Sequence, residues 1–177
     1  MRRLGAIIAG GRSSRFGTDK AQAVLDGRTL LDHVADALDA QCDALIICGR
    51  AWDNRISVAD RPRPGLGPLG GLCAALHFGA TNGFDVVVTA GCDTLPVPTM
   101  PDDGAHAVVV AGHYLFGVWP AALARHLDVH LMTTQDRSMR RWIAVSGARQ
   151  IAVAADLHNL NTPADFRHYA LTQGLAA

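Results

Sequence analysis

Short apolar runs alternate along this chain with longer segments in which apolar residues recur every three or four positions. Short runs of this kind are typical of buried strands, and the longer segments are typical of helices that cover a sheet. The alternation therefore predicts an α/β fold with a mostly parallel sheet and crossover helices. The strands in the first part of the chain are expected at Leu4–Ala9, Ala44–Cys48, Ile56–Ala59, Asp85–Ala90 and Ala105–Ala111.

The helices can be placed from the same periodicity. The first should run from Thr29 to Ala40, because its leucines and Val34 fall on one face. A second should begin at Pro68, since proline suits the first turn of a helix. Thr162 before Pro163 predicts the N-cap of a closing helix. Between them we expect a strand at His113–Trp119, helices at Pro120–His130 and Ser138–Val145, and a strand at Gln150–Ala154.

Length and charge limit the classes of protein that the chain can belong to. At 177 residues and 49% hydrophobic composition, residues 1–177 should form a single three-layer domain. Sixteen basic and sixteen acidic residues balance, which argues against nonspecific binding to nucleic acid or to a membrane surface. We found neither a secretory signal nor an apolar segment of transmembrane length. The cysteines show no C-x-x-C pairing, so we expect reduced thiols and a cytoplasmic protein.

The segment from Ile7 to Ala21 carries the strongest chemical signal. It joins an apolar strand to a loop that contains three glycines and the cations Arg12, Arg15 and Lys20. Glycines let the backbone approach a ligand closely, exposed N–H groups can bind an anion, and the cations suit phosphate oxygens. A tight turn without a ligand would explain the glycines but not the three cations. The loop therefore predicts a nucleoside triphosphate site.

Neither of the two common phosphate-binding patterns is present. A P-loop needs lysine directly after its last glycine, but Gly17 is followed by Thr18 and Asp19. The Rossmann pattern fails because Gly10 and Gly11 are adjacent, which disfavours a nicotinamide-dependent oxidoreductase. No G-x-S-x-G segment is found either, so covalent catalysis is unsupported.

A second polar segment, Cys92–Leu95, directly follows a predicted strand, as the glycine-rich loop does. Ligands of open α/β sheets lie beyond the carboxyl ends of the strands, so the two segments can meet. Asp93 would then supply a carboxylate for Mg²⁺, which often uses one or two carboxylates together with substrate phosphates. The alternative is that Asp93 only caps a turn.

Four motifs in order resemble the molybdenum cofactor guanylyltransferases and the wider group of nucleotidyltransferases to which they belong. Residues Ala9–Lys20 match A-G-G-x-S-x-R-[MF]-G-x-D-K throughout. Further matches are Gly67–Leu72 with G-P-L-[AG]-G, Cys92–Pro96 with C-D-x-P, and Asn159–Asp165 with N-[IV]-N-T-P-[EA]-[DE]. In the third match the proline stands one place later. The resemblance extends over residues 7 to 165.

The resemblance implies a Rossmann-like fold of the nucleotide-diphospho-sugar-transferase type. It also implies magnesium-dependent transfer of GMP from GTP to molybdenum-molybdopterin, which yields molybdopterin guanine dinucleotide and pyrophosphate. Cytidylyl transfer from CTP to the same acceptor is an alternative, because a phosphate loop does not distinguish bases. A noncatalytic nucleotide-binding or cofactor-binding module is another. Transient contact with proteins of cofactor biosynthesis or molybdoenzyme maturation would accompany the reaction.

Roles for individual residues follow from the motif matches. Lys20 should neutralise phosphate charge, Arg15 should clamp the phosphates, and Asp93 should bind the metal. Gly49 stands where the family often has asparagine, so a base or ribose contact is either missing or made by backbone. The residues expected to contact the nucleotide or its metal are Ile8, Ala9, Gly10, Gly11, Lys20, Asp60, Gly67, Pro68, Leu69, Asp93, Asn159 and Asn161.

Several of these residues also have purely structural explanations. Asp60 could be a turn former, the glycines after Gly67 could mark a helix start, and the two asparagines could bond their own turn. His126 and His130 have the spacing of zinc ligands, but without a third ligand they are interpreted as surface histidines.

Overall fold

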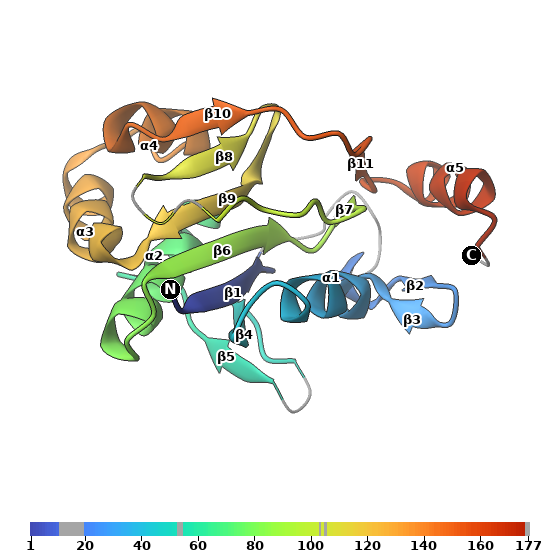
Figure 1. Cartoon of the computed structure of the whole chain (residues 1–177), viewed down its shortest axis with the longest axis horizontal. Helices are drawn as coiled ribbons and strands as arrows, with labels where there is room; N and C mark the ends of the chain where they lie inside the picture. The colour runs from blue at the N-terminus through green and yellow to red at the C-terminus, as the bar shows by residue number, and fades with distance from the viewer. Residues whose placement is uncertain (11–19, 53–54, 103, 105, 176–177) are drawn as a thin grey trace.

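The protein is described by a computed structural model that covers residues 1–10, 20–52, 55–102, 104 and 106–175. Its centre is a seven-stranded sheet in the order β10-β8-β9-β6-β1-β4-β5 (Figure 1). All neighbouring strands are parallel except β9, which is antiparallel to both β6 and β8. The mostly parallel sheet is thus confirmed. The strands are β1 (Arg3–Ile8), β4 (Ala44–Cys48), β5 (Ile56–Val58), β6 (Val86–Gly91), β8 (Val108–Val110), β9 (His113–Pro120) and β10 (Arg149–Ile151).

Helices cover both faces of the sheet and so form the predicted three layers. One buried cluster joins α1 (Leu30–Asp39) and α5 (Pro163–Gln173) to Ile7 and Val88. The other joins α2 (Pro68–Thr81), α3 (Ala124–Thr133) and α4 (Met139–Ser146) to Ala6 and Val87. Successive residues of β1 and β6 point to opposite faces, and both faces are apolar, as expected for strands buried between helices.

The ends of the helices agree with the capping signals in the sequence. The Thr29 hydroxyl accepts a hydrogen bond from the backbone of Asp32 at the start of α1. Thr162 and Asp165 form a capping box at the start of α5, with Pro163 in the first turn. Ser138 caps α4, and Gly147 ends it in a left-handed conformation. Short polar side chains, and proline in α5, therefore set the starts of these helices at the positions that the sequence predicted.

The second half of the chain differs from the predicted elements in detail. The helix expected from Pro120 is a 3-10 turn, η2 (Ala121–Leu123), followed by α3. The strand expected at Gln150–Ala154 is β10, which is short and pairs with β8 at the edge of the sheet. Two small antiparallel pairs were not predicted because each strand has only two residues: β2 (Val24–Leu25) with β3 (Arg28–Thr29), and β7 (Thr94–Leu95) with β11 (His158–Asn159).

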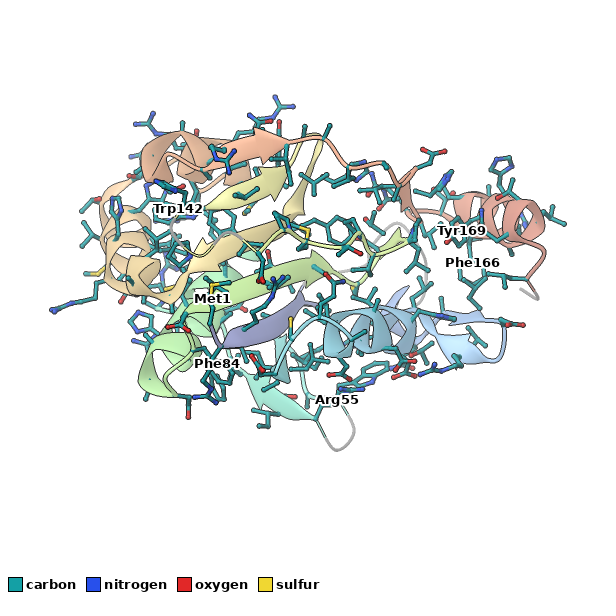
Figure 2. The ribbon with its side chains drawn as sticks, in the orientation of Figure 1. Met1, Arg55, Phe84, Trp142, Phe166 and Tyr169 are labelled. Atoms are coloured by element: carbon teal, nitrogen blue, oxygen red, sulfur yellow. The ribbon has the colours of Figure 1, made fainter. Side chains whose placement is uncertain are left out.

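The large side chains of the two clusters lie at separate places in the molecule. Trp142 of α4 is fully buried on the face of α2 and α3, whereas Phe166 and Tyr169 of α5 are buried on the face of α1 (Figure 2). Within the described residues, no helix has the length and apolar character that a membrane crossing requires.

Candidate functional site

The carboxyl ends of β1, β4 and β5 bring Gly10, Gly49 and Asp60 together. Parallel pairing sets β1 beside β4, and the Ala9 amide donates to the Cys48 carbonyl at 3.0 Å. The Gly49 amide in turn donates to the carbonyl of Val58 at 2.9 Å. Three segments far apart in sequence therefore end at one edge of the sheet, where α/β proteins bind their ligands.

Gly10 and Gly49 approach each other so closely that Gly49 has no space for a side chain. Gly49 has φ +85°, and a Cβ built on it would lie 2.5 Å from the Gly10 Cα. A Cβ on Gly10 would lie 3.2 Å from the Gly49 Cα. An asparagine at the Gly49 position, which the family resemblance led us to expect, would therefore clash here. At this point of the site the chain can offer a ligand only backbone groups.

Asp60 lies between this glycine pair and the first turn of α2. A Cβ on Gly70 would approach the Asp60 Cβ to 3.1 Å, and the Arg61 amide donates to the Gly70 carbonyl at 3.1 Å. Burial raises the pKa of the Asp60 carboxyl, since it disfavours the charged form. Its surroundings thus hold Asp60 at the junction of strand and helix.

The N-terminus of α2 is open next to Asp60. Gly67 is the N-cap with φ +64°, Pro68 occupies the first turn, and no side chain caps the helix. An uncapped N-terminus leaves backbone N–H groups that favour an anion. Gly67 and Pro68 are exposed, but Leu69 is fully buried in the core. Leu69 can therefore reach a ligand only through its backbone.

A cavity of about 280 Å³ opens beside these residues. Its lining includes Gly49, Asp60 and Pro64, together with Arg50 and Ser57, which the sequence did not single out. Arg50 directly follows Gly49, and Ser57 belongs to the predicted strand that precedes Asp60, so closeness to these two residues in the sequence was the available signal. The cavity offers both apolar and hydrogen-bonding surface, as ligand sites generally do.

Asp93 follows β6 and lies in space next to the segment Asn159–Leu160, which precedes the last helix. It is half-buried, and its Oδ1 lies 3.5 Å from the hydroxyl of Thr94. The Thr94 hydroxyl donates its proton to Asn159 Oδ1 at 2.7 Å, and the Leu160 amide donates to the Asp93 carbonyl at 2.7 Å. The pairing of β7 with β11 thus brings Asp93 and Asn159 together. Asn161 lies at the start of α5, where its backbone amide donates to Asp165.

The remaining predicted site residues belong to the start of the chain. Ile8 ends β1 and Ala9 follows it, and both are buried, so they would contact a ligand chiefly through backbone. Gly11 and Arg15 fall in 11–19, outside the described residues. Lys20 is the first residue of a 3-10 helix, η1 (Lys20–Gln22), and only its backbone is described.

One sequence interpretation is wrong. His130 is not a surface histidine: it is 4% exposed, and its ring centre lies 5.4 Å from that of Trp142. The same Trp142 ring also contacts His126, which is exposed. The helical spacing of the two histidines therefore reflects packing against α4, and the pKa of His130 is lowered mainly by burial.

Together these features define an α/β protein whose candidate ligand site lies at the carboxyl edge of a mostly parallel sheet. The described part of this site combines glycine backbone, an open helix N-terminus and two acids, Asp60 after β5 and Asp93 after β6, at the carboxyl ends of parallel strands. Glycine backbone and helix N-termini suit phosphate, and carboxylates suit a divalent cation. The geometry is that of the nucleotide-binding α/β class.

Comparisons with known proteins identify the family. Residues 5–153 match the MobA-like NTP transferase domain. A molybdenum cofactor guanylyltransferase of Cereibacter sphaeroides is 36% identical over 93% of this chain and 94% of its own length. The chain therefore belongs to the molybdenum cofactor guanylyltransferase family of nucleotidyltransferases.

Solved structures agree with the fold. Molybdopterin-guanine dinucleotide biosynthesis protein A from Archaeoglobus fulgidus superposes with a TM-score of 0.71 at 16% identity, over 97% of this chain and 98% of that one. A Mycobacterium tuberculosis protein solved in complex with manganese has a TM-score of 0.61 at 16% identity, over 97% of this chain and 100% of that one. At sequence identities this low, the two superpositions support the fold and nothing further.

Proposed function

We propose that this protein transfers GMP from GTP to molybdenum-molybdopterin, forming molybdopterin guanine dinucleotide and pyrophosphate. Its membership of the guanylyltransferase family supports the reaction class. The observation that carries the proposal is the meeting of Gly10, Gly49, Asp60 and the α2 N-terminus beside one cavity. Three of the four family motifs contribute to, or lie next to, that edge of the sheet.

The proposed chemistry is a direct displacement at phosphorus. A phosphate oxygen of the acceptor attacks the α-phosphorus of GTP, a new P–O bond forms, and the bond to the bridging oxygen breaks as pyrophosphate leaves. The acceptor phosphate is already anionic at neutral pH, so no general base is required. Positioning of the two substrates and stabilisation of developing charge then account for the rate.

Asp93 is the proposed holder of Mg²⁺. Its half-buried carboxylate is an oxygen ligand of the kind magnesium prefers, and Asp93 lies two residues after the end of β6 at the carboxyl edge. When bound, the ion would neutralise phosphate charge. A divalent ion is consistent with the manganese complex of the distant M. tuberculosis protein. Thr94 and Asn159 position this segment by holding β7 against β11.

The nucleotide would be held by groups of different kinds. We assign the phosphates to Arg15, Lys20 and the amides that follow β1, on the basis of the family motif. The cavity beside Asp60 is the proposed place of the guanine, whose N–H groups suit a carboxylate acceptor. Gly49 would make backbone contacts where other members carry a side chain. The proposed partners are therefore GTP and molybdopterin, with contact to maturation proteins as a further proposal.

A nucleotide titration tests the proposal. Calorimetry with Mg²⁺ should show tight binding of GTP and weak binding of CTP, and pyrophosphate should be released only with acceptor present. Asp93→Asn keeps the shape of the side chain and should lower turnover by about 10²- to 10³-fold, the usual effect of removing one charge-stabilising group. The neighbouring Cys92→Ser is the control and should retain turnover. Tighter binding of CTP than GTP, or full activity of Asp93→Asn, would contradict the assignment.

A further inference from the structure

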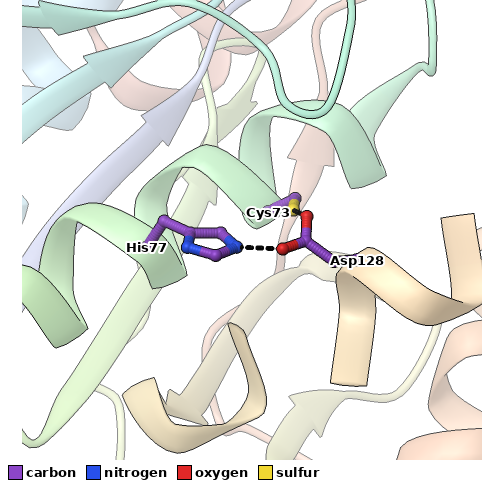
Figure 3. A group of neighbouring side chains, drawn as sticks. All are labelled: Cys73, His77 and Asp128. Atoms are coloured by element: carbon purple, nitrogen blue, oxygen red, sulfur yellow. Dashed lines mark hydrogen bonds and ion pairs between the residues drawn. The ribbon is translucent and has the colours of Figure 1, made fainter. Parts of the chain in front are cut away.

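The helices α2 and α3 bring together a thiol, an imidazole and a carboxylate that the proposed reaction does not use. Cys73 and His77 are four residues apart on α2, so they project from the same face one turn apart. Asp128 faces them from α3 (Figure 3). The sulfur of Cys73, a ring nitrogen of His77 and a carboxylate oxygen of Asp128 all lie within 4.8 Å of one another.

The contacts within this group, the Cys73–His77–Asp128 cluster, are short. The Cys73 Sγ donates to Asp128 Oδ1 at 3.1 Å, and His77 Nε2 lies 2.5 Å from Asp128 Oδ2. One carboxylate therefore contacts both of the other groups through its two oxygens. Tetrahedral zinc separates such ligand atoms by about 3.4 to 3.6 Å, so small side-chain rotations would admit an ion between them.

The three side chains of the cluster differ in their exposure to solvent. Cys73 is fully buried, while the side chains of His77 and Asp128 are 23% and 26% exposed. The thiol lies at the buried end, and the partial exposure of His77 and Asp128 gives an ion a way in from solvent. A packed core would use an aliphatic side chain at Cys73 equally well. The thiol next to a carboxylate is therefore a chemical feature that packing does not explain.

We propose that Cys73, His77 and Asp128 bind a zinc ion that clamps α2 to α3. Thiolate sulfur, imidazole nitrogen and carboxylate oxygen are the three ligand types zinc uses. A thiolate and a carboxylate balance the two charges of the ion, so the occupied site is neutral and can be half-buried. On binding, the Cys73 thiol proton is released to solvent as the S–Zn bond forms.

This site differs in chemistry from the proposed magnesium site. Magnesium takes oxygen ligands and has little affinity for thiolate, whereas zinc prefers nitrogen and sulfur. The two ions should therefore occupy separate places. The clamp also bears on the nucleotide site, because α2 begins at Pro68 and packs its first turn against Asp60. Fixing α2 against α3 would hold that turn in position.

Cobalt provides a direct probe, because Co²⁺ replaces zinc and absorbs strongly in the near ultraviolet when a thiolate is a ligand. We would titrate Co²⁺ into reduced, chelator-treated protein with Mg²⁺ in excess. The expected result is one Co²⁺ bound per chain with a thiolate charge-transfer band, which equimolar Zn²⁺ removes. Zinc should also raise Tm by about 5 °C or more when it saturates the site.

Variants locate the ion. Cys73→Ser should lose the band, and His77→Gln, at a partly exposed position, should weaken Co²⁺ binding by more than the roughly 10- to 100-fold that loss of an outer-sphere partner costs. Cys92→Ser is the matched control, since it removes the thiol next to Asp93, and His126→Gln removes another α3 imidazole. Both should keep the band.

Two results would overturn the proposal. One is wild-type protein that binds Co²⁺ without a thiolate band. The other is a band that survives in Cys73→Ser or disappears in Cys92→Ser. Far-ultraviolet circular dichroism verifies that each variant is folded, and if Cys73→Ser is not, unchanged Co²⁺ affinity of His77→Gln would refute the site by itself. GTP binding is measured separately, so failure of this proposal leaves the nucleotide assignment unaffected.

Discussion

Gly49 combines a left-handed backbone with a close approach to Gly10, and each constraint has its own energetic consequence. Gly49→Ala should destabilise the protein by about 1 to 2 kcal/mol, because alanine disfavours the left-handed conformation. The new Cβ would also displace the Gly10 backbone, whose Cα it would meet at 2.5 Å. We expect a total loss of about 3 kcal/mol of unfolding free energy, measured by urea denaturation, and weaker GTP binding.

Gly112→Ala separates the two effects. Gly112 has φ +79°, close to that of Gly49, but a Cβ there meets nothing within 4 Å. It should therefore lose only the conformational part, about 1 kcal/mol, and bind GTP normally. Equal destabilisation of the two variants would show that the approach of Gly10 to Gly49 is unimportant.

The charge of Asp60 should lower the stability of the folded protein while strengthening its binding of GTP. Burial raises its folded pKa above the unfolded value, so the ionised carboxylate is disfavoured in the folded protein at neutral pH. The native state gains stability as the pH falls through the folded pKa. Asp60→Asn has the same shape but no charge, so it should be more stable than wild type at pH 7, with an advantage that shrinks toward about pH 4.

The same substitution should weaken nucleotide binding, because a charge-assisted hydrogen bond to the base is lost. We expect GTP affinity to fall by about 10- to 100-fold, the range for a hydrogen bond to a charged group. Calorimetry measures the affinity, and urea denaturation across pH measures the stability. If Asp60 served only as a turn former, affinity would be unchanged in Asp60→Asn.

For single residues, the sequence predicted which residues lie at strand ends better than it predicted what those residues contact. The predicted strands placed Gly10, Asp60 and Asp93 after strand ends, and the structure has them there. The local pattern did not reveal that Gly49 excludes a side chain, since the reason is a contact with Gly10, 39 positions earlier. Nor did it reveal the burial of His130, which depends on Trp142 in another helix. Contacts between distant segments leave no mark on local periodicity.

Among the elements, α5 shows how a cap supports the end of the chain. The Thr162 hydroxyl accepts from the Asp165 amide, and the Asp165 carboxylate accepts from the amides of Thr162 and Asn161. Thr162→Ala should lose about 1 kcal/mol of unfolding free energy and loosen the Asn159–Asn161 segment, detected as faster amide exchange there.

A matched control lies in the same helix. The Thr172 hydroxyl donates to the Tyr169 carbonyl in the last turns of α5, and within the described part of the chain no backbone amide donates to it. Thr172→Ala should therefore change stability by less than about 0.5 kcal/mol. If both variants lost the same amount, the capping box would not be the source of the effect.

Element prediction succeeded where the signal was local. Buried strands such as β4 have continuous apolar runs, and helix starts at Thr29, Ser138 and Thr162 carry capping side chains. The β7–β11 pair was missed because each strand has only two residues and the pairing joins distant segments: Leu95 pairs with His158, and Thr94 pairs with Asn159. This missed pair is the one that brings Asn159 to Asp93, so part of the site depended on it.

For the whole molecule, the order of the strands explains why the site lies at one edge. The strands β1, β4, β5 and β6 are parallel neighbours, so their carboxyl ends coincide, and the segments after them converge. The antiparallel β9 lies between β6 and β8 and extends the sheet away from this region. Composition and periodicity predicted the layers and the parallel character, but the antiparallel insertion is set by long-range pairing.

Both faces of the sheet share β1 and β6, so residues 1–177 should unfold as one domain. The three tryptophans test this: Trp52 packs with the α1 face, while Trp119 and Trp142 are buried on the α2 face. In protein labelled with 5-fluorotryptophan, the three native ¹⁹F signals should disappear at one urea concentration. GTP with Mg²⁺ at about 100 times Kd should shift all three by an equivalent of about 2.7 kcal/mol. Separate midpoints, or a shift confined to one face, would instead reveal two units that fold independently.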